Sequence, residues 1–329
     1  MTNEHAVHAR GLVKRFGEKV ALAGVDFEVK TGTVTAILGP NGAGKTTAVR
    51  ILATLSEATE GEATVAGFDV RTQGHEVRRR IGLAAQDATV DPLLTGRENL
   101  IMLGELHQMS RAEASARAEE LLGEFSLLDA ADRRVSTYSG GMRRRLDLGA
   151  TMVAHPSVLF LDEPTTGLDP RARNELWGVL DTLVERGTTV LLTTQYLDEA
   201  ERLADDIIVI DHGRIIARGD ARTLKRELGG DHVQIVLVEV DRLPDAARLL
   251  EQVTGAKVAI DAGIRSVVAA APNGVDTLVE VARSLASAGI AVEDLSIRQP
   301  TLDEVFIALT DSPAYDDDSV EAAQSGARP

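Results

Sequence analysis

The sequence predicts an α/β protein with a mostly parallel β-sheet, followed by a smaller α+β domain. A glycine-rich loop at residues 39–47 separates the apolar strand Val34–Leu38 from a helix with apolar residues at helical spacing. Residues 158–161 form a run without a polar residue, as a parallel strand buried on both faces does. Beyond about residue 229, the strand and helix signals follow the order βαββαβ, which is typical of a small split α+β domain.

Length and composition set the broad class. The 329 residues have room for about two domains, each with its own core. No apolar run approaches the ~18 residues of a membrane-spanning helix, and the N-terminus has no signal-peptide pattern. The absence of cysteine excludes disulfides and thiol catalysis and favours a cytosolic setting.

The charge balance is acidic. A net charge of −16 argues against a nucleic-acid partner, which would need a basic face. Part of this charge lies in residues 311–329, which include Asp316, Asp317 and Asp318. We expect that segment to be a disordered acidic tail.

Two strands are predicted ahead of the glycine-rich loop. Residues 6–13 form the first, and Val25, Phe27 and Val29 alternate with acidic residues in a second, half-buried strand. Phe16 falls just before the turn between them. Its ring either closes the core at a strand end or offers a flat surface on which an adenine base can stack.

The loop itself matches the pattern G-x-x-x-x-G-K-[ST] in the strand–loop–helix setting that this motif needs. Its glycines let backbone N–H groups curl around phosphate oxygens, and the helix start adds further N–H groups and its dipole. Lys45 supplies a positive charge for the β- and γ-phosphates, and Thr46 supplies a hydroxyl for Mg²⁺. The predicted ATP-binding residues of the loop are Gly39, Pro40, Asn41, Gly42, Ala43, Gly44, Lys45, Thr46 and Thr47.

A helical block at about residues 88–153 interrupts the α/β pattern. Residues 95–109 form one predicted helix, and Ser110 with Glu113 makes a capping box that opens the next. A small turn, Ser139-Gly140-Gly141, then leads into another helix. The sequence therefore predicts an inserted helical subdomain.

Two carboxylates follow the buried strand at residues 158–161. At the carboxyl end of such a strand, Asp162 can hold Mg²⁺ through its water shell. Glu163 directs a second carboxylate toward the γ-phosphate, where it can polarise an attacking water. Acidic residues are common at the start of a polar loop, so it is the phosphate loop that favours the catalytic interpretation.

The remaining elements complete the order. A helix at residues 173–186 precedes a buried strand at 189–194 that ends at Gln195, and a hairpin follows around Asp211-His212-Gly213. In the second domain we expect strands at 233–240, 257–260, 266–270 and 291–297 and helices at 244–253, 275–288 and 302–309.

Taken in chain order, five motifs resemble the nucleotide-binding subunit of an ABC transporter over about residues 7–219: the phosphate loop, Gln86, Ser139-Gly140-Gly141, Asp162-Glu163 and Leu168-Asp169. The resemblance implies a P-loop NTPase cassette with a parallel core sheet, an antiparallel β subdomain and the inserted helical subdomain. The cassette would then span residues 1–229, the α+β accessory domain residues 230–310, and the tail residues 311–329.

The resemblance also implies roles. Phe16 would stack on adenine, and Gln86 would complete the Mg²⁺ shell together with Thr46 and Asp162. Ser139, Gly140 and Gly141 would contact the ATP that the opposite subunit of a homodimer binds. Asp169 would bridge the two subunits.

Two positions depart from the family's pattern. Met142 stands where the family usually has glutamine, and Gln195 stands where it usually has histidine. Glutamine does not titrate, but its amide can donate a hydrogen bond to a γ-phosphate oxygen, so we group Gln195 with Glu163 as catalytic. The stretches around both positions, and Leu302-Asp303-Glu304-Val305-Phe306, resemble the daunorubicin-resistance type of drug-efflux ATPase.

The function implied is ATP hydrolysis that energises efflux of drugs or other amphiphiles. The partners would be a separate transmembrane permease and a second copy of the chain, at the cytoplasmic face of the membrane. A soluble ABC-type ATPase that remodels ribosomes or DNA is an alternative, which the single cassette and the absence of sustained heptads disfavour. A third possibility is the ATPase of an importer, which only the resemblance to the drug-efflux subfamily excludes. The second domain either steadies the dimer or the permease, or is a passive addition.

Overall fold

The computed structural model describes residues 4–85, 89–227, 230–271 and 273–302, together with residues 304 and 306. The chain divides into two compact units, residues 1–220 and 221–329. The sequence places the boundary at residue 229, but helix α8 (Ala221–Glu227) groups with the second unit. Residues of α8 line a hollow together with Asp231 and Gln299 of that unit.

A six-stranded sheet forms the centre of the first unit, in the order β10-β9-β3-β8-β7-β6. All neighbouring strands are parallel except β10, which pairs antiparallel with β9. Every residue of β3, β7 and β8 is buried, which explains their apolar and β-branched sequences and confirms the predicted parallel core. The bounds are β3 (Val34–Leu38), β6 (Ile81–Ala84), β7 (Val158–Asp162), β8 (Thr189–Thr194), β9 (Asp206–Asp211) and β10 (Arg214–Gly219).

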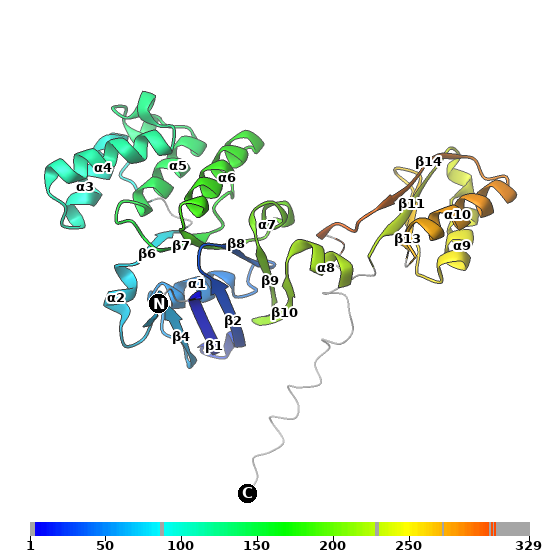
Figure 1. Ribbon diagram of the computed structural model, residues 1–329, viewed down its shortest axis with the longest axis horizontal. Coiled ribbons are helices and arrows are strands. Elements are labelled where there is room, and N and C mark those ends of the chain that lie inside the picture. Colours follow the sequence, from blue (N-terminus) through cyan, green and yellow to red (C-terminus); the bar gives the residue numbers. More distant parts are fainter. Residues whose placement is uncertain are drawn as a thin grey trace, which may run out of the picture. The chain divides into compact units, whose positions relative to one another are not determined.

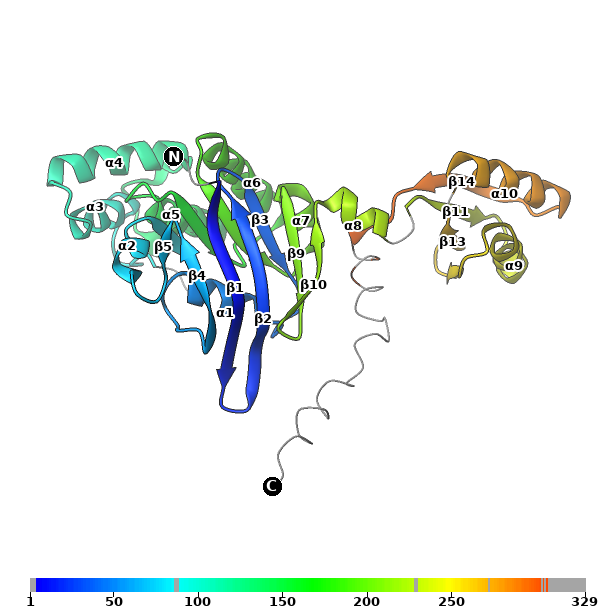
Figure 2. The same cartoon turned by 60° about the horizontal axis from the view of Figure 1, so that its bottom comes forward.

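An antiparallel sheet, ordered β2-β1-β4-β5, packs against the central sheet and helix α1 (Lys45–Leu52). Its strands are β1 (His5–Phe16), β2 (Lys19–Lys30), β4 (Glu60–Val65) and β5 (Phe68–Asp69). Figure 2 shows β1 and β2 as a long antiparallel pair. Phe27 of β2, Val49 of α1 and Phe160 of β7 belong to one apolar core, so this core ties the phosphate loop to both sheets.

Helices α3 (Gly96–Leu106), α4 (Arg111–Glu124) and α5 (Gly140–Thr151) form the helical block at one end of this unit (Figure 1). Thr95 with Glu98 and Ser110 with Glu113 close capping boxes at the first two helix starts. Short turns η1 (Leu128–Ala130) and η2 (Val135–Thr137) lie between α4 and α5, while α2 (Gly74–Arg78), α6 (Pro170–Glu185) and α7 (Leu197–Leu203) complete the unit. Among the described residues, no helix has both the length and the apolar content to cross a lipid bilayer.

The second unit is an antiparallel sheet, ordered β12-β13-β11-β14, with helices α9 and α10 on one face (Figure 1). Val233, Ile235 and Leu237 alternate into a core with Leu250 and Leu285. The bounds are β11 (His232–Leu237), η3 (Val240–Arg242), α9 (Leu243–Thr254), β12 (Ala259–Asp261), β13 (Ser266–Ala270), α10 (Val275–Ser287) and β14 (Val292–Arg298). Residues 302, 304 and 306 are helical. The rest of the expected helix at 302–309 and the tail at 311–329 lie outside the described residues.

Candidate active site

The glycine-rich loop follows β3 and runs directly into α1. A Cβ atom at Gly39 would collide with the carbonyl oxygen of Ile210, and one at Gly44 with that of Ala21. Gly42 and Gly44 also have positive φ angles of 86° and 111°, which L side chains rarely adopt. No side chain caps the start of α1, so its first N–H groups remain available to a phosphate.

Lys45 is 4% exposed and lies inside the curve of the loop. Its Nζ donates to the carbonyl oxygens of Gly39 at 2.8 Å and Pro40 at 3.1 Å. The same atom forms an ion pair with Oε1 of Glu163 at 3.4 Å. The loop lysine therefore lies between the phosphate cradle and the second predicted carboxylate.

Thr46, Asp162 and Thr193 form a small cluster of oxygen atoms. The hydroxyls of Thr46 and Thr193 both donate to Oδ1 of Asp162, at 3.0 Å and 2.6 Å. Asp162 is the last residue of β7 and is 5% exposed. Such a set of hard oxygen donors suits Mg²⁺, which binds through one or two carboxylates together with water and phosphate oxygens.

Glu163 has an unusual backbone conformation. Its φ of 48° lies in the left-handed region, which costs about 1–3 kcal/mol in a residue other than glycine. Its N–H donates to both the carbonyl oxygen and the hydroxyl of Thr193, each at 3.1 Å. Thr166 donates to Oε2 at 3.3 Å. The chain therefore fixes this carboxylate closely, and stored strain of this kind is found at functional positions.

The Ser139-Gly140-Gly141 turn begins helix α5. Ser139 caps that helix by accepting from the N–H of Met142 at 3.2 Å. Asp169 caps α6 in the same way, because its carboxylate accepts from the N–H of Ala172 at 2.8 Å. Gly140 and Glu163 both line one hollow of about 330 Å³, so the start of α5 and the second carboxylate share a space.

Three predicted site residues remain to be considered. Phe16 ends β1 and is 56% exposed, which excludes a core aromatic and places the ring at the surface. Gln195 is partly exposed and follows β8, the strand between β3 and β7. It therefore lies at the edge of the sheet that carries the phosphate loop and the carboxylates. Gln86 lies outside the described residues.

The structure adds a pair that the sequence analysis missed. Arg144 donates to the carbonyl oxygens of Ala85 and Pro164, both at 2.8 Å, and lies 3.4 Å from Asp147. Asp147 accepts from the N–H of Thr89 at 2.6 Å. Burial raises the pKa of Asp147 and lowers that of Arg144. The signal in the sequence was an Arg and an Asp three positions apart on one helix.

This arrangement of a parallel sheet, an antiparallel sheet and a helical block around a phosphate loop is the fold of ATP-binding cassettes. The ABC transporter family model matches residues 22–166. A solved dimeric ATP-binding cassette in a post-hydrolysis state with ADP and Pi is 28% identical, with a TM-score of 0.59. That match covers 65% of this chain and 98% of that one.

The relationship extends through both units. The daunorubicin resistance ATP-binding protein DrrA2 of Streptomyces coeruleorubidus is 52% identical over 97% of this chain and 99% of its own length. The family model for the C-terminal domain of DrrA1-3-like ATP-binding proteins matches residues 219–310. The Nod factor export ATP-binding protein I of Burkholderia lata is 43% identical over 69% of this chain and 75% of its own. The chain belongs to the daunorubicin resistance family of ABC transporter ATP-binding proteins, and it is an ATPase.

Proposed function

We propose that ATP hydrolysis by a homodimer of this chain drives export of drugs or other amphiphiles through a separate transmembrane permease. The observation that carries the proposal is the cluster in which Lys45, Thr46, Asp162 and Glu163 meet at one edge of the sheet. The names of relatives support export and drug resistance, since one is a daunorubicin resistance protein and another a Nod factor export protein.

ATP is bound through its phosphates and its base. The N–H groups of the loop and the Lys45 ammonium face the β- and γ-phosphates. The exposed ring of Phe16 is a stacking surface for adenine, and the Nζ of Lys14 lies 4.9 Å from the centre of this ring. The loop residues Gly39, Pro40, Asn41, Gly42, Ala43, Gly44 and Thr47 complete the cradle.

Thr46 and Asp162 fit Mg²⁺, and we assign them as its protein ligands together with Gln86. When bound, Mg²⁺ neutralises charge on the phosphate oxygens. Thr193 orients Asp162 by donating to the carboxylate oxygen that also accepts from Thr46. The second hydroxyl thereby fixes the direction in which this carboxylate faces.

Glu163 acts as the general base. Its backbone is held in the left-handed region by Thr193, and Thr166 holds one carboxylate oxygen. The other oxygen then accepts a proton as water attacks the γ-phosphate and the bond to ADP breaks. Gln195 cannot accept that proton, and its amide donates a hydrogen bond to a γ-phosphate oxygen.

The second copy completes the site. The start of α5 offers the N–H groups of Gly140 and Gly141 and the hydroxyl of Ser139 to the γ-phosphate bound by the partner. Asp169, at the start of α6, bridges the two copies. An isologous dimer of this kind contains two equivalent ATP sites. The dimeric cassette that resembles this chain supports the arrangement.

The permease would bring the ATPase to the cytoplasmic face of the membrane. The test is co-purification in detergent with a membrane protein of about six helices, followed by ATPase measurement with and without daunorubicin. We expect a stable complex whose ATPase rate rises with the drug. Lys45→Ala is the matched control, because it removes the positive charge that binds the phosphates and leaves the permease surface intact. Failure to bind any permease, with ATPase activity indifferent to the drug, would support a soluble ATPase instead.

A further inference from the structure

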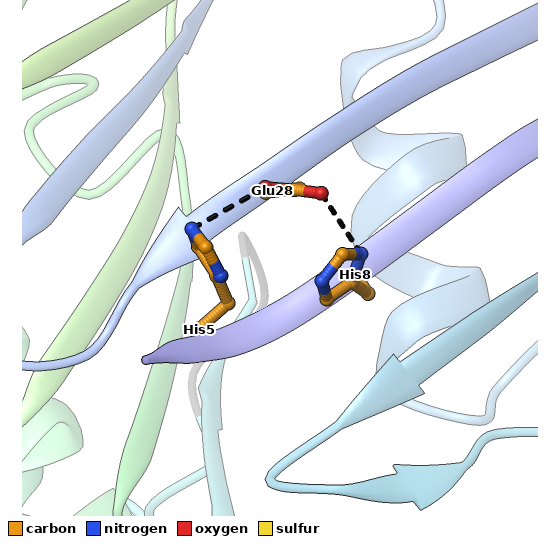
Figure 3. A group of neighbouring side chains, drawn as sticks. All are labelled: His5, His8 and Glu28. Atoms are coloured by element: carbon orange, nitrogen blue, oxygen red, sulfur yellow. Dashed lines mark ion pairs between the residues drawn. The ribbon is translucent and has the colours of Figure 1, made fainter. Parts of the chain in front are cut away.

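Three polar side chains meet on the antiparallel sheet, away from the ATP site. Nε2 of His5 lies 3.3 Å from Oε2 of Glu28, and Nδ1 of His8 lies 3.2 Å from Oε1. Figure 3 shows both imidazole rings of β1 turned toward the carboxylate of Glu28 on the neighbouring strand β2. The ligand atoms that the three side chains offer all lie within 4.8 Å of one another.

A backbone irregularity brings the two histidines together. Residues three apart on a regular strand face opposite sides of the sheet. In β1, however, the pairing register with β2 shifts between His5 and Val7, and Ala6 and Val7 are both buried. This bulge returns His5 to the side on which His8 pairs with Glu28. Bulges of this kind re-aim side chains at the cost of ladder hydrogen bonds.

We propose that His5, His8 and Glu28 form a surface site for a divalent first-row transition-metal ion, with Zn²⁺ as the preferred ion. Two imidazole nitrogens and a carboxylate are a ligand set of zinc sites, whereas Mg²⁺ and Ca²⁺ prefer oxygen alone. Ligands at tetrahedral positions about 2.0–2.1 Å from Zn²⁺ lie about 3.3–3.4 Å apart. Each of the two nitrogen–oxygen separations is close to that value, but they involve different oxygens of Glu28. Binding both nitrogens and one oxygen to a single ion therefore needs small side-chain rotations, which the 4.8 Å spread of the ligand atoms allows.

The ligand side chains are open to solvent, and a neighbouring strand holds the backbone of one of them. The side chains of His5, His8 and Glu28 are 24%, 34% and 39% exposed, so water can reach the ion and occupy a remaining position. The backbone oxygen of Glu28 accepts from Nη2 of Arg218 at 2.8 Å, which fixes this part of β2. The Arg218 side chain also pairs with Asp206.

The site is separate from the ATP chemistry. His5 begins β1 and Phe16 ends it, and a strand of that length spans about 35 Å. A bound ion would join the start of β1 to β2 and stabilise the antiparallel sheet. Its effect would therefore appear in the stability of the first unit and not in turnover.

Calorimetric titration of the chelator-treated full chain with ZnCl₂ tests the proposal, in excess Mg²⁺ and without nucleotide. We expect one equivalent of Zn²⁺ to bind, and Co²⁺ to give a tetrahedral absorption spectrum. His8→Gln and Glu28→Gln should each weaken Zn²⁺ binding at least tenfold and abolish the rise in melting temperature that Zn²⁺ causes. His212→Gln, at a histidine that is 94% exposed, is the matched control and should bind like the natural chain.

Equal Zn²⁺ affinity in the natural chain, His8→Gln and Glu28→Gln would overturn the proposal, and so would the absence of any one-equivalent binding step. Circular dichroism of each variant shows whether it folds. If His8→Gln does not fold, Glu28→Gln and His5→Gln answer the same question at other ligands.

Discussion

Nζ of Lys45 lies 3.4 Å from Oε1 of Glu163, and these side chains are only 4% and 9% exposed. Two buried charges of opposite sign stabilise each other, because neither has much water around it. A triphosphate in the loop offers Lys45 other anionic partners. Under the proposed mechanism, we expect the bound triphosphate to free the Glu163 oxygen to face the attacking water, which would couple substrate binding to the readiness of the base.

Glu163→Gln tests that relationship. The amide keeps the shape but cannot accept a proton, so kcat should fall by about 10²–10⁴. ATP affinity should remain, since Lys45 and the rest of the phosphate loop are unchanged. Nucleotide binding, steady-state hydrolysis and gel filtration with ATP measure this, and we expect dimers with trapped ATP. Equal loss of binding and turnover would remove Glu163 from the role of base.

Gln195 should position phosphate without moving protons. Gln195→Ala removes one hydrogen bond to a charged group, worth about 1.5–3 kcal/mol, so kcat should fall about 10–150-fold with most nucleotide affinity kept. Gln195→His should retain activity and introduce a pH dependence near neutrality, because imidazole titrates there. Measurements of kcat against pH at saturating Mg-ATP compare the three proteins. An unchanged kcat in Gln195→Ala would show that this residue takes no part in turnover.

Arg144 and Asp147 should be energetically coupled. Asp147 is 1% exposed, so Arg144→Met leaves a buried carboxylate without its cation and should cost about 3–5 kcal/mol of unfolding free energy. The double variant Arg144→Met/Asp147→Leu should lose less than the sum of the two single variants. Urea unfolding measures all four proteins. Strict additivity would mean that the pair is not coupled.

Local patterns predicted much of the fold and of the site. The phosphate loop and the apolar run ending at Asp162 carry their signals within a few residues, and so do the capping boxes of α3 and α4. Contacts between strands were not predictable in this way. Thr193 reaches Asp162 only because β8 lies between β3 and β7, and strand order is a tertiary property.

The directions of some side chains also could not be predicted from the sequence. Phe16 could have been core or surface, because a strand end has no neighbouring residues that decide the matter. His5 and His8 are three apart, and regular alternation separates them. The bulge that joins them depends on pairing with β2, so the cluster with Glu28 has no signature in the sequence of β1 alone.

Glu304 should make the second unit sensitive to acid. Both of its carboxylate oxygens accept from Arg298, at 2.6 Å and 2.8 Å, and the N–H of Thr301 donates at 2.9 Å. These bonds lower the pKa of Glu304 from 4.5 to about 2, with the Arg298 hydrogen bond as the largest cause. A carboxylate with a lowered pKa in the folded state adds stability above its ordinary pKa. That stability is lost as the pH falls from about 4.5 toward 2.

Glu304→Gln should therefore lower the unfolding free energy of the second unit at pH 7 by about 1–2 kcal/mol, after allowance for the partial exposure of both groups. The difference from the natural chain should shrink steadily below pH 4.5. Calorimetry of both proteins between pH 7 and pH 3 measures this difference, and Glu280→Gln, on an exposed position of α10, is the control. A difference that stays constant over this pH range would mean that Glu304 contributes by packing, because only an ionised carboxylate gives the pH dependence.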